Sequence, residues 1–446
     1  MAKKENRHAE LVSASANIEA PYELPDGWKW CRLMDCASVI SKGTTPKGGK
    51  DAYLKEGVNF LRIENLNDDG SINLSNISHI SVEEHEGNLK RSILKEGDLL
   101  ISIAGTLGKV GFVTKADLPM NTNQAIAFVR LHKDIFDNKY LKYAIESPFV
   151  NAELLTKTKV TSIPNLTLEI ISNCLIPLPP TLAEQQRIVN RIETMFAKLD
   201  QAQEKAQAVL DSFETRKAAI LHKAFTGQLT ANWRKANGVP DDSWEEKKIS
   251  DCCIPRAGYA FDSKKFTTVG FQIIRMGNLY AGELDLSRNP VYYSENDLDD
   301  SIKKRALIAD GDILITLTGT KYKRDYGYAV RIDNPNDLLV NQRILCLTPK
   351  NEIKTNYLLY YLHSNMFRDV FFSNETGGVN QGNVSSKFVE SISFRMPSLP
   401  EQQEIVRILD AVLEKETRAK EAAQTVLDQI ALLKKSILAR AFRGEL

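Results

Sequence analysis

The sequence of 446 residues is 43% hydrophobic and 26% charged, and its formal net charge is +1. This length and composition indicate a folded protein with about two or three domains. The longest apolar runs, at 99–103 and 313–317, are far shorter than the ~20 residues of a membrane-spanning helix, and the first twenty residues lack the apolar core of a signal peptide. We therefore expect a cytoplasmic protein, while the net charge neither requires nor excludes a nucleic-acid partner.

The cysteines give no indication of a metal site. They form no CxxC pair, and no histidine stands at metal-ligand spacing from them. We expect buried free thiols and no bound metal at Cys31, Cys36, Cys174, Cys252, Cys253 and Cys346.

The second half of the chain repeats the first. LKEGDLLISIAGT, from Leu94, reappears as LIADGDILITLTGT from Leu307, and AEQQRIVNRI reappears as PEQQEIVRIL. AFTGQL, from Ala224, reappears at the same offset as AFRGEL from Ala441. Such internal similarity predicts that the two halves fold alike.

Each copy begins with a region of short elements. After an N-terminal extension at 1–25, the first domain covers 26–180, and the second covers 243–397 after a linker at 230–242. Short apolar runs separated by turn residues, as at Asn67 to Gly70, predict strands with a few helices. One of these helices is expected from Asp137, and its counterpart from Thr355. We therefore predict two tandem mixed α+β domains.

A long helix is predicted after each domain, at 181–229 and at 398–446. Thr181 with Glu184 and Ser398 with Glu401 match the capping box, in which hydroxyl and carboxylate bond each other's backbone amides. Gly227 and Gly444 suit the helix ends. Apolar residues recur about every 3.5 residues, which favours an antiparallel coiled coil over two helices that each cover their own domain. The predicted seam comprises Ile188, Ile192, Met195, Leu199, Ala202, Ala206, Val209, Phe213 and Ile220, and Ile405, Leu409, Val412, Glu416, Ala419, Ala423, Val426, Ile430, Leu433 and Ile437.

This arrangement resembles the specificity subunit of type I restriction-modification enzymes. The resemblance rests on two variable domains, each followed by a P-x-x-EQQ-x-I helix that closes in AF-x-G-x-L. It implies that each domain is a target recognition domain for one half of a split DNA sequence. It also implies two modification (methyltransferase) subunits and restriction (translocase and nuclease) subunits as partners. S-adenosylmethionine, ATP and magnesium would then bind those partners.

The repeat supports the same interpretation on physical grounds. Two like helices packed antiparallel are related by an approximate twofold axis, as are the two strands of duplex DNA. Because the two domains differ in sequence, the recognised site should be bipartite and non-palindromic. The same arrangement predicts that AFRGEL lies beside 21–28, as AFTGQL lies beside 240–244.

Candidate DNA contacts are loops rich in glycine, hydroxyl, amide and basic residues, whose groups can reach phosphates and base edges. In the first domain these are Lys42, Gly43, Thr44, Thr45, Lys47, Thr106, Lys109, Lys157, Thr158 and Lys159. In the second they are Arg256, Tyr259, Thr320, Lys321, Lys323, Arg324, Gly378, Asn380 and Gln381. Residues that match between the copies are assigned a shared structural role instead, because base-reading residues should differ: these are Arg62 and Arg275, and Asn123-Gln124 and Asn341-Gln342.

The repeated EQQ motif is a candidate docking site. Gln185, Gln186, Gln402 and Gln403 are polar and lie where helix meets domain. They could bind the modification subunits, with helix capping as the alternative explanation of the motif.

Catalytic motifs are not found. The best match to a methyltransferase tetrad, Asn289-Pro290-Val291-Tyr292, has no glycine-rich cofactor loop before it and suits a turn before a strand. A phosphate-binding GxxxxGK[ST] loop is absent. We therefore expect a protein that binds DNA while its partners catalyse. A coiled-coil scaffold for protein or carbohydrate, and a stand-alone methyltransferase or nuclease, are the alternatives.

Overall fold

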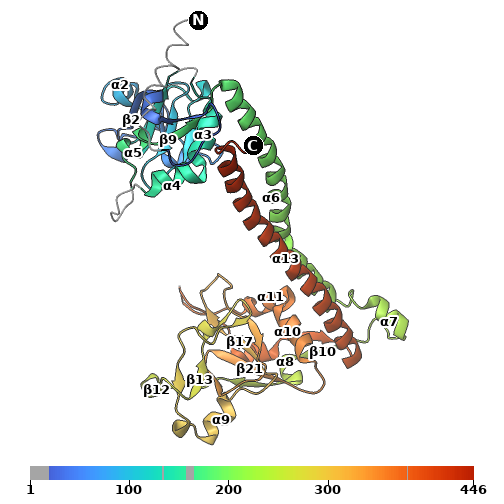
Figure 1. The fold of residues 1–446 in the computed structure, drawn as a ribbon. Coiled ribbons are helices and arrows are strands. Elements are labelled where there is room, and N and C mark those ends of the chain that lie inside the picture. The colour runs from blue at the N-terminus through green and yellow to red at the C-terminus, as the bar shows by residue number, and fades with distance from the viewer. Residues whose placement is uncertain (1–19, 133–134, 157–164, 379) are drawn as a thin grey trace, which may run out of the picture. The chain divides into compact units, whose positions relative to one another are not determined.

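The computed structural model describes residues 20–132, 135–156, 165–378 and 380–446 (Figure 1). The chain divides into two compact units, one of Met1–Ala206 with Thr425–Leu446 and the other of Gln207–Gln424. Each of the long helices α6 (Leu182–Phe225) and α13 (Leu399–Ala441) therefore contributes one part to each unit. Within the described ranges, no helix is long and apolar enough to cross a lipid bilayer.

The first unit contains a mixed α+β domain, as predicted. Its four-stranded antiparallel sheet has the order β2-β8-β5-β6, and a three-stranded sheet has the order β4-β3-β7, with β3 and β7 parallel. The antiparallel pair β1-β9 joins the beginning of the domain to its end. The strands are β1 (Lys29–Arg32), β2 (Ala37–Lys42), β3 (Val58–Leu61), β4 (Ser78–Ile80), β5 (Leu99–Ser102), β6 (Val110–Phe112), β7 (Met120–Thr122), β8 (Ile126–Leu131) and β9 (Leu175–Leu178). The helices are α2 (Val82–Glu86), α3 (Asn138–Glu146), α4 (Pro148–Thr156) and α5 (Leu168–Ser172).

The second unit repeats this plan. Its sheet β11-β21-β17-β19 corresponds to β2-β8-β5-β6, and β16-β13-β20 corresponds to β4-β3-β7, with β12 added at its edge. The strands are β10 (Glu245–Lys248), β11 (Cys253–Ala257), β12 (Phe266–Thr267), β13 (Phe271–Ile274), β14 (Leu279–Tyr280), β15 (Glu283–Leu284), β16 (Tyr292–Tyr293), β17 (Ile313–Thr316), β18 (Thr318–Gly319), β19 (Ala329–Arg331), β20 (Leu338–Val340), β21 (Ile344–Pro349), β22 (Gly382–Asn383) and β23 (Ser393–Met396). The helices are α7 (Ala231–Asn237), α8 (Ile249–Cys252), α9 (Asp300–Ala306), α10 (Thr355–His363), α11 (Asn365–Ser373) and α12 (Ser386–Ser391).

The two long helices pack antiparallel within each unit. In the first unit, Lys434 Nζ lies 2.5 Å from the Asp200 carboxylate. In the second, Arg216 Nε lies 2.8 Å from the carboxylate of the predicted seam residue Glu416. The predicted α6 seam is buried or half-buried throughout. On α13 the prediction is wrong at Ala419, Val426 and Leu433, which are exposed, whereas Leu427 and Leu438 are half-buried and buried. An α-helix has about 3.6 residues per turn, so its buried face shifts gradually away from a strict repeat of about 3.5 residues.

The AF motifs complete the cores of the two domains. Phe225, at the end of α6, packs its ring 5.4 Å from Tyr357 in the second unit, and Phe442 packs 5.2 Å from the equivalent Tyr140 in the first. Burial of each phenylalanine contributes about 1.5–3 kcal/mol. Tyr22 Oη donates to Phe442 O at 2.9 Å, which confirms that AFRGEL lies beside 21–28.

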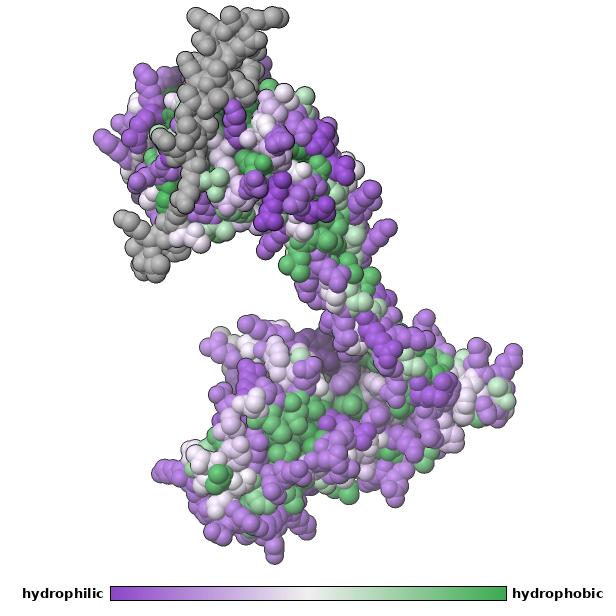
Figure 2. Space-filling view, in the orientation of Figure 1, coloured by the Kyte–Doolittle hydropathy of each residue, from purple (hydrophilic) through white to green (hydrophobic). Residues whose placement is uncertain are grey.

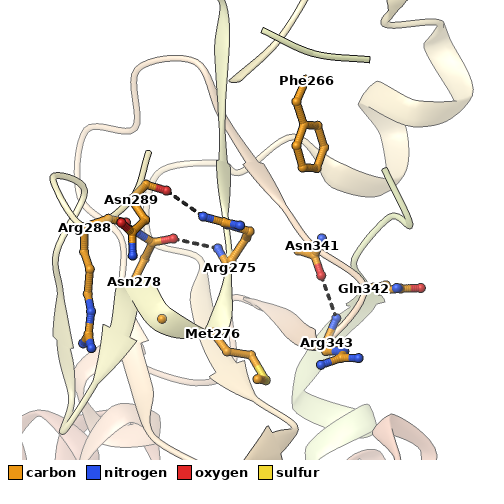
Figure 3. Close-up of a pocket in the computed structure, with 10 residues that line it drawn as sticks. Phe266, Arg275, Met276, Asn278, Arg288, Asn289, Asn341, Gln342 and Arg343 are labelled. Atoms are coloured by element: carbon orange, nitrogen blue, oxygen red, sulfur yellow. Dashed lines mark hydrogen bonds between the residues drawn. The ribbon is translucent and has the colours of Figure 1, made fainter. Parts of the chain in front are cut away.

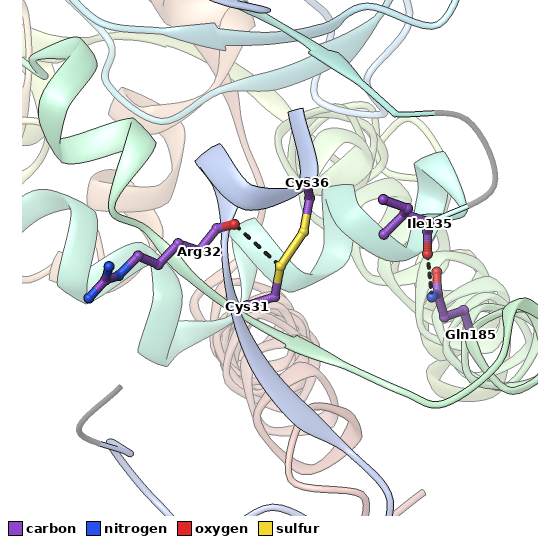
Figure 4. Close-up of a disulfide and its surroundings, with 5 residues drawn as sticks. All are labelled: Cys31, Arg32, Cys36, Ile135 and Gln185. Atoms are coloured by element: carbon purple, nitrogen blue, oxygen red, sulfur yellow. Dashed lines mark hydrogen bonds between the residues drawn. A yellow bond between two sulfur atoms is a disulfide. The ribbon is translucent and has the colours of Figure 1, made fainter. Parts of the chain in front are cut away.

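The first glutamine of each EQQ motif joins the helix to its domain. Gln185 is buried, accepts a hydrogen bond from Asp137 N at 2.8 Å and donates to Ile135 O at 2.9 Å (Figure 4). Gln402 repeats this bond as the acceptor for Lys354 N at 2.8 Å. Because both side chains are enclosed and bonded inside their units, we remove them from the proposed partner contacts.

The predicted capping boxes form only in part. Both helices begin directly after the predicted caps, and Glu184 N donates to Thr181 Oγ1 at 3.2 Å. The carboxylates, however, bond arginines instead of returning to the caps. Glu184 contacts Arg187 at 2.8 Å near the surface.

Glu401 occupies the matching position and is fully buried. It accepts hydrogen bonds from Thr230 Oγ1 at 2.6 Å and from Arg234 Nη1 at 2.7 Å. Arg234 also donates from Nη2 to Gly227 O at 2.8 Å. This cluster therefore fixes the end of α6 to the beginning of α13 in the second unit.

The free-thiol prediction is wrong for two cysteines. Cys31 in β1 and Cys36 at the end of the short 3-10 turn that follows β1 form a disulfide (Figure 4). Cys174, Cys252, Cys253 and Cys346 are buried thiols outside any disulfide, as predicted. Burial raises the pKa of Cys252 to about 11 and that of Cys253 to about 12, so both thiols are protonated at neutral pH.

The substitution Arg234→Ala should destabilise the second unit by about 3–5 kcal/mol, because it leaves the buried Glu401 carboxylate without its charge partner. The matched control Arg187→Ala breaks the exposed pair with Glu184 and should cost at most about 1 kcal/mol. Urea unfolding monitored by hydrogen exchange at the beginnings of α6 and α13 measures both effects. Equal losses in the two variants would contradict this account.

Candidate DNA interface

A turn with the sequence Asn-Gln connects the two sheets in each unit. In the first, Asn123 Oδ1 accepts a hydrogen bond from Ala125 N at 3.1 Å, and in the second, Asn341 Oδ1 accepts one from Arg343 N at 3.4 Å. The asparagines therefore hold the turn, as predicted. Gln124 and Gln342 are exposed, so the buried hydrogen-bonding role that we predicted for them is wrong.

A glycine packs against each Asn-Gln turn. A Cβ atom on Gly43 would lie 2.1 Å from Asn123 O, and one on Gly258 would lie 2.1 Å from Asn341 O. No side chain fits at such a distance. Gly43, which we predicted as a DNA contact, is thus required by the backbone packing whether or not DNA approaches it.

A second repeated motif lies beside the turn. Asn65 Oδ1 accepts from Arg62 N at 3.0 Å, and Asn278 Oδ1 accepts from Arg275 N at 2.9 Å. The arginine side chains have different partners. Arg62 pairs with Glu64 at 2.8 Å, whereas Arg275 Nη2 donates to Asn289 O at 2.6 Å. The backbone role is therefore shared and the side-chain role is not.

Two neighbouring hollows in the second unit share Gln342 and Arg343. Their volumes are about 470 and 630 Å³. Figure 3 shows the first, with Arg275 between Arg288 and Arg343 in this view. Its lining comprises Phe266, Arg275, Met276, Gly277, Asn278, Arg288, Asn289, Asn341, Gln342 and Arg343, and among these described residues there is no carboxylate. The hollow is therefore electropositive and suits an anionic or acceptor-rich ligand.

The predicted contact loops of the second domain meet in space. Lys321 Nζ donates to Gly377 O at 2.9 Å, and Gly378 and Gln381 line the second hollow. Thr320 lies beside Lys321, and Lys323 and Asn380 are exposed. Arg324 pairs with Asp369 at 2.6 Å near the surface. Tyr322, which sequence reasoning missed, is 80% exposed in this loop.

Three predicted contacts have internal partners. Arg256 Nη2 lies 2.5 Å from the fully buried Asp312 carboxylate, so it stabilises the sheet and we remove it from the proposed contacts. Its neighbour Tyr259 is half-buried, with its ring 5.0 Å from that of Phe261. Lys109 Nζ lies 2.7 Å from Asp68 and donates to Leu66 O at 3.2 Å, which ties two loops together.

The other predictions for the first domain are placed as follows. Lys42, Lys47 and Thr106 are exposed, and Thr44 and Thr45 are half-buried beside the Asn-Gln turn, where Thr44 N donates to Thr122 O at 3.0 Å. Lys157, Thr158 and Lys159 lie outside the described residues. On the face drawn in Figure 2, hydrophilic residues cover most of each unit, with smaller apolar areas between them.

The chain is similar to proteins of one family. A family model described as the type I restriction modification DNA specificity domain matches it twice, over residues 25–210 and 241–427. The chain is 24% identical over 432 residues to the specificity subunit of the type I restriction enzyme EcoKI from Escherichia coli strain K12. This alignment covers 95% of this chain and 90% of the relative. It is 32% identical over 184 residues to the EcoBI specificity subunit of Escherichia coli, across 41% of this chain and 38% of that relative.

The fold is also found among solved structures. A chain from a structure that describes complex assembly and conformational transition of the type I R-M system matches with a TM-score of 0.73 and 19% identity. The match covers 96% of this chain and all of the other. At this level of identity, the likeness establishes the fold.

The substitution Gly258→Ala should distort the Asn-Gln turn of the second domain and destabilise that domain by roughly 1–3 kcal/mol, because its Cβ meets backbone oxygen. Gly277→Ala is the matched control, since a Cβ there has no atom within 4 Å. The melting temperature and hydrogen exchange at 338–346 measure the effect. If the two variants behaved alike, the close packing would not matter for the turn.

Proposed function

The chain belongs to the family of type I restriction modification DNA specificity domains, and on this premise we propose that it reads a bipartite, non-palindromic DNA sequence, one half with each domain. The observation that carries the proposal is that one scaffold occurs twice with different exposed side chains. Asn123 and Asn341 hold the same turn in both domains, while the residues around the turns differ in charge. A shared framework with unlike reading residues suits two unlike half-sites.

The second domain offers chemistry suited to DNA. Its two hollows expose guanidinium and amide groups, which donate to phosphate oxygens and to base edges. Neutralisation of phosphates makes such binding weaken with salt. We propose the remaining exposed candidates, including Lys42 and Lys47 in the first domain and Lys323 in the second, as contacts to the DNA backbone.

We further propose that the chain recruits enzymes and has no catalytic role of its own. Its partners are two methyltransferase subunits and the translocase and nuclease subunits of a restriction system, which bind S-adenosylmethionine, ATP and magnesium. Such a complex would act on cytoplasmic DNA. The start of α6 after the first domain and the start of α13 after the second would each supply a docking site for one methyltransferase subunit.

Replacement of residues 26–180 by the corresponding domain of a relative should change one half of the recognised sequence and leave the other half unchanged. Mapping of methylated adenines in cells that express the variant with its modification subunit measures this. A change in both halves would contradict the assignment of one half-site to each domain. If the wild-type chain did not bind duplex DNA, or if its affinity for duplex DNA did not depend on salt, a scaffold for protein or carbohydrate would be favoured.

The exposed second glutamines of the EQQ motifs test subunit docking. The side chain of Gln186 donates to Asn190, one turn along its own helix, at 3.1 Å, and both Gln186 and Gln403 are exposed. The double variant Gln186→Ala and Gln403→Ala should weaken co-purification of the modification subunits without a change in melting temperature. Undiminished affinity and stoichiometry would indicate that the motif serves only the internal bonds of Gln185 and Gln402.

A further inference from the structure

The same turn carries different side chains in the two domains. The amide that donates to the turn asparagine belongs to Ala125 in the first domain and to Arg343 in the second. The next residue, Ile126 or Ile344, donates its amide to the asparagine carbonyl in both, at 3.3 and 3.0 Å. Arg343 and Ala125 therefore occupy equivalent positions on equivalent backbones.

The guanidinium of Arg343 is free to bind a ligand. Three other arginines of this domain are engaged: Arg256 with Asp312, Arg275 with Asn289 O, and Arg324 with Asp369. Arg288 is exposed and, like Arg343, its side chain has no hydrogen-bond or ion-pair partner within the described residues, but Arg288 lines only the first hollow. Within the part of the chain that the structure describes, no hydrogen bond or ion pair involves the Arg343 side chain, which is exposed and lines both hollows. Its backbone is held, because Arg343 O accepts a hydrogen bond from Leu317 N at 3.0 Å. The guanidinium of Arg343 is thus an available donor on a hydrogen-bonded backbone.

The surroundings of the turn also differ in charge. Gly277 in the second domain stands where the first has Glu64, since both lie between the arginine and asparagine of the repeated motif. Arg288 stands where the first domain has Asn76, directly after Ser75 or Ser287, whose amides bond Asn73 and Asp285 in the same way at 2.9 Å. The second domain is therefore basic at two positions where the first is neutral, Arg343 and Arg288, and neutral at a third, Gly277, where the first is acidic.

This difference has a chemical meaning for base recognition. The planar guanidinium presents paired donors that match O6 and N7 of guanine in the major groove, and alanine cannot make this contact. A phosphate contact is the other use of an arginine. A base contact is favoured because Arg343 lies in a recess on a rigid turn, while exposed lysines such as Lys323 are placed to meet the DNA backbone.

Building on the proposed function, we propose that Arg343 is a specificity-determining residue that reads a guanine in the half-site of the second domain. The first domain lacks this contact because Ala125 stands at the equivalent position. The half-sites thus differ at the base pair that faces this turn.

The test uses the full chain co-expressed with its modification subunits. Binding to a library of randomised duplexes, and methylation mapped in cells, are compared for the wild type, Arg343→Ala and Arg343→Lys. Arg343→Ala should lose roughly 10–100-fold discrimination at one guanine of the second half-site, with the first half-site unchanged. Arg343→Lys keeps the charge and loses the paired donors, so it should restore affinity more than it restores the preference for guanine.

The controls separate this proposal from the proposed function. Lys304→Ala removes an exposed positive charge from α9 outside the hollows and should leave every base preference unchanged. A uniform loss of affinity in Arg343→Ala, fully restored by lysine, would assign Arg343 to a phosphate and overturn the proposal. A wild-type second half-site without guanine would overturn it too, while bipartite recognition would stand. Absence of any sequence preference in the wild-type complex would instead contradict the proposed function.

Discussion

The burial of one phenylalanine from each long helix determines how the rest of the structure is organised. Phe225 ends the helix that follows the first domain, yet its ring lies against Tyr357 in the core of the second unit. Phe442 directly follows the end of the other helix and lies against Tyr140 in the first unit. At the opposite ends, Gln185 and Gln402 bond the helices to the domains that precede them. Each domain is thus anchored by two helices, and its loops are left free to vary.

The sequence allowed the fold to be predicted where both copies need the same residue for the same packing. The starts of the two long helices, the position of AFRGEL beside 21–28 and the α6 seam are of this kind. The α13 seam failed at Val426 and Leu433, because a regular heptad assumes a constant phase and the real helix drifts. The Cys31–Cys36 disulfide was missed because the second copy has no matching pair of cysteines: Cys252 corresponds to Cys36, but Lys247 stands where the first copy has Cys31.

The site residues, too, were predictable where both copies share them and were missed where only one copy has them. Asn123 and Asn341 were recognisable as structural because they repeat. Arg256 was misassigned because its partner Asp312 is distant in sequence, so the ion pair leaves no local pattern. Arg343 was overlooked for the opposite reason: it lacks a counterpart in the first copy, and an isolated arginine looks like any surface charge. Comparison of the copies reveals the framework, whereas the residues that we propose to read DNA are those in which the copies differ.

The exchanged helix ends also affect the order in which the chain can fold during synthesis. The second unit is continuous, Gln207–Gln424, and all its core residues have emerged once that segment is made. The first unit needs Leu438, Ala441 and Phe442 for its core, although its domain is translated first. Its apolar pocket beside Tyr140 therefore stays open until more than half of the chain has followed. Completion of the first unit therefore comes after synthesis of the second, and until then the first domain exposes the apolar surface that Phe442 covers.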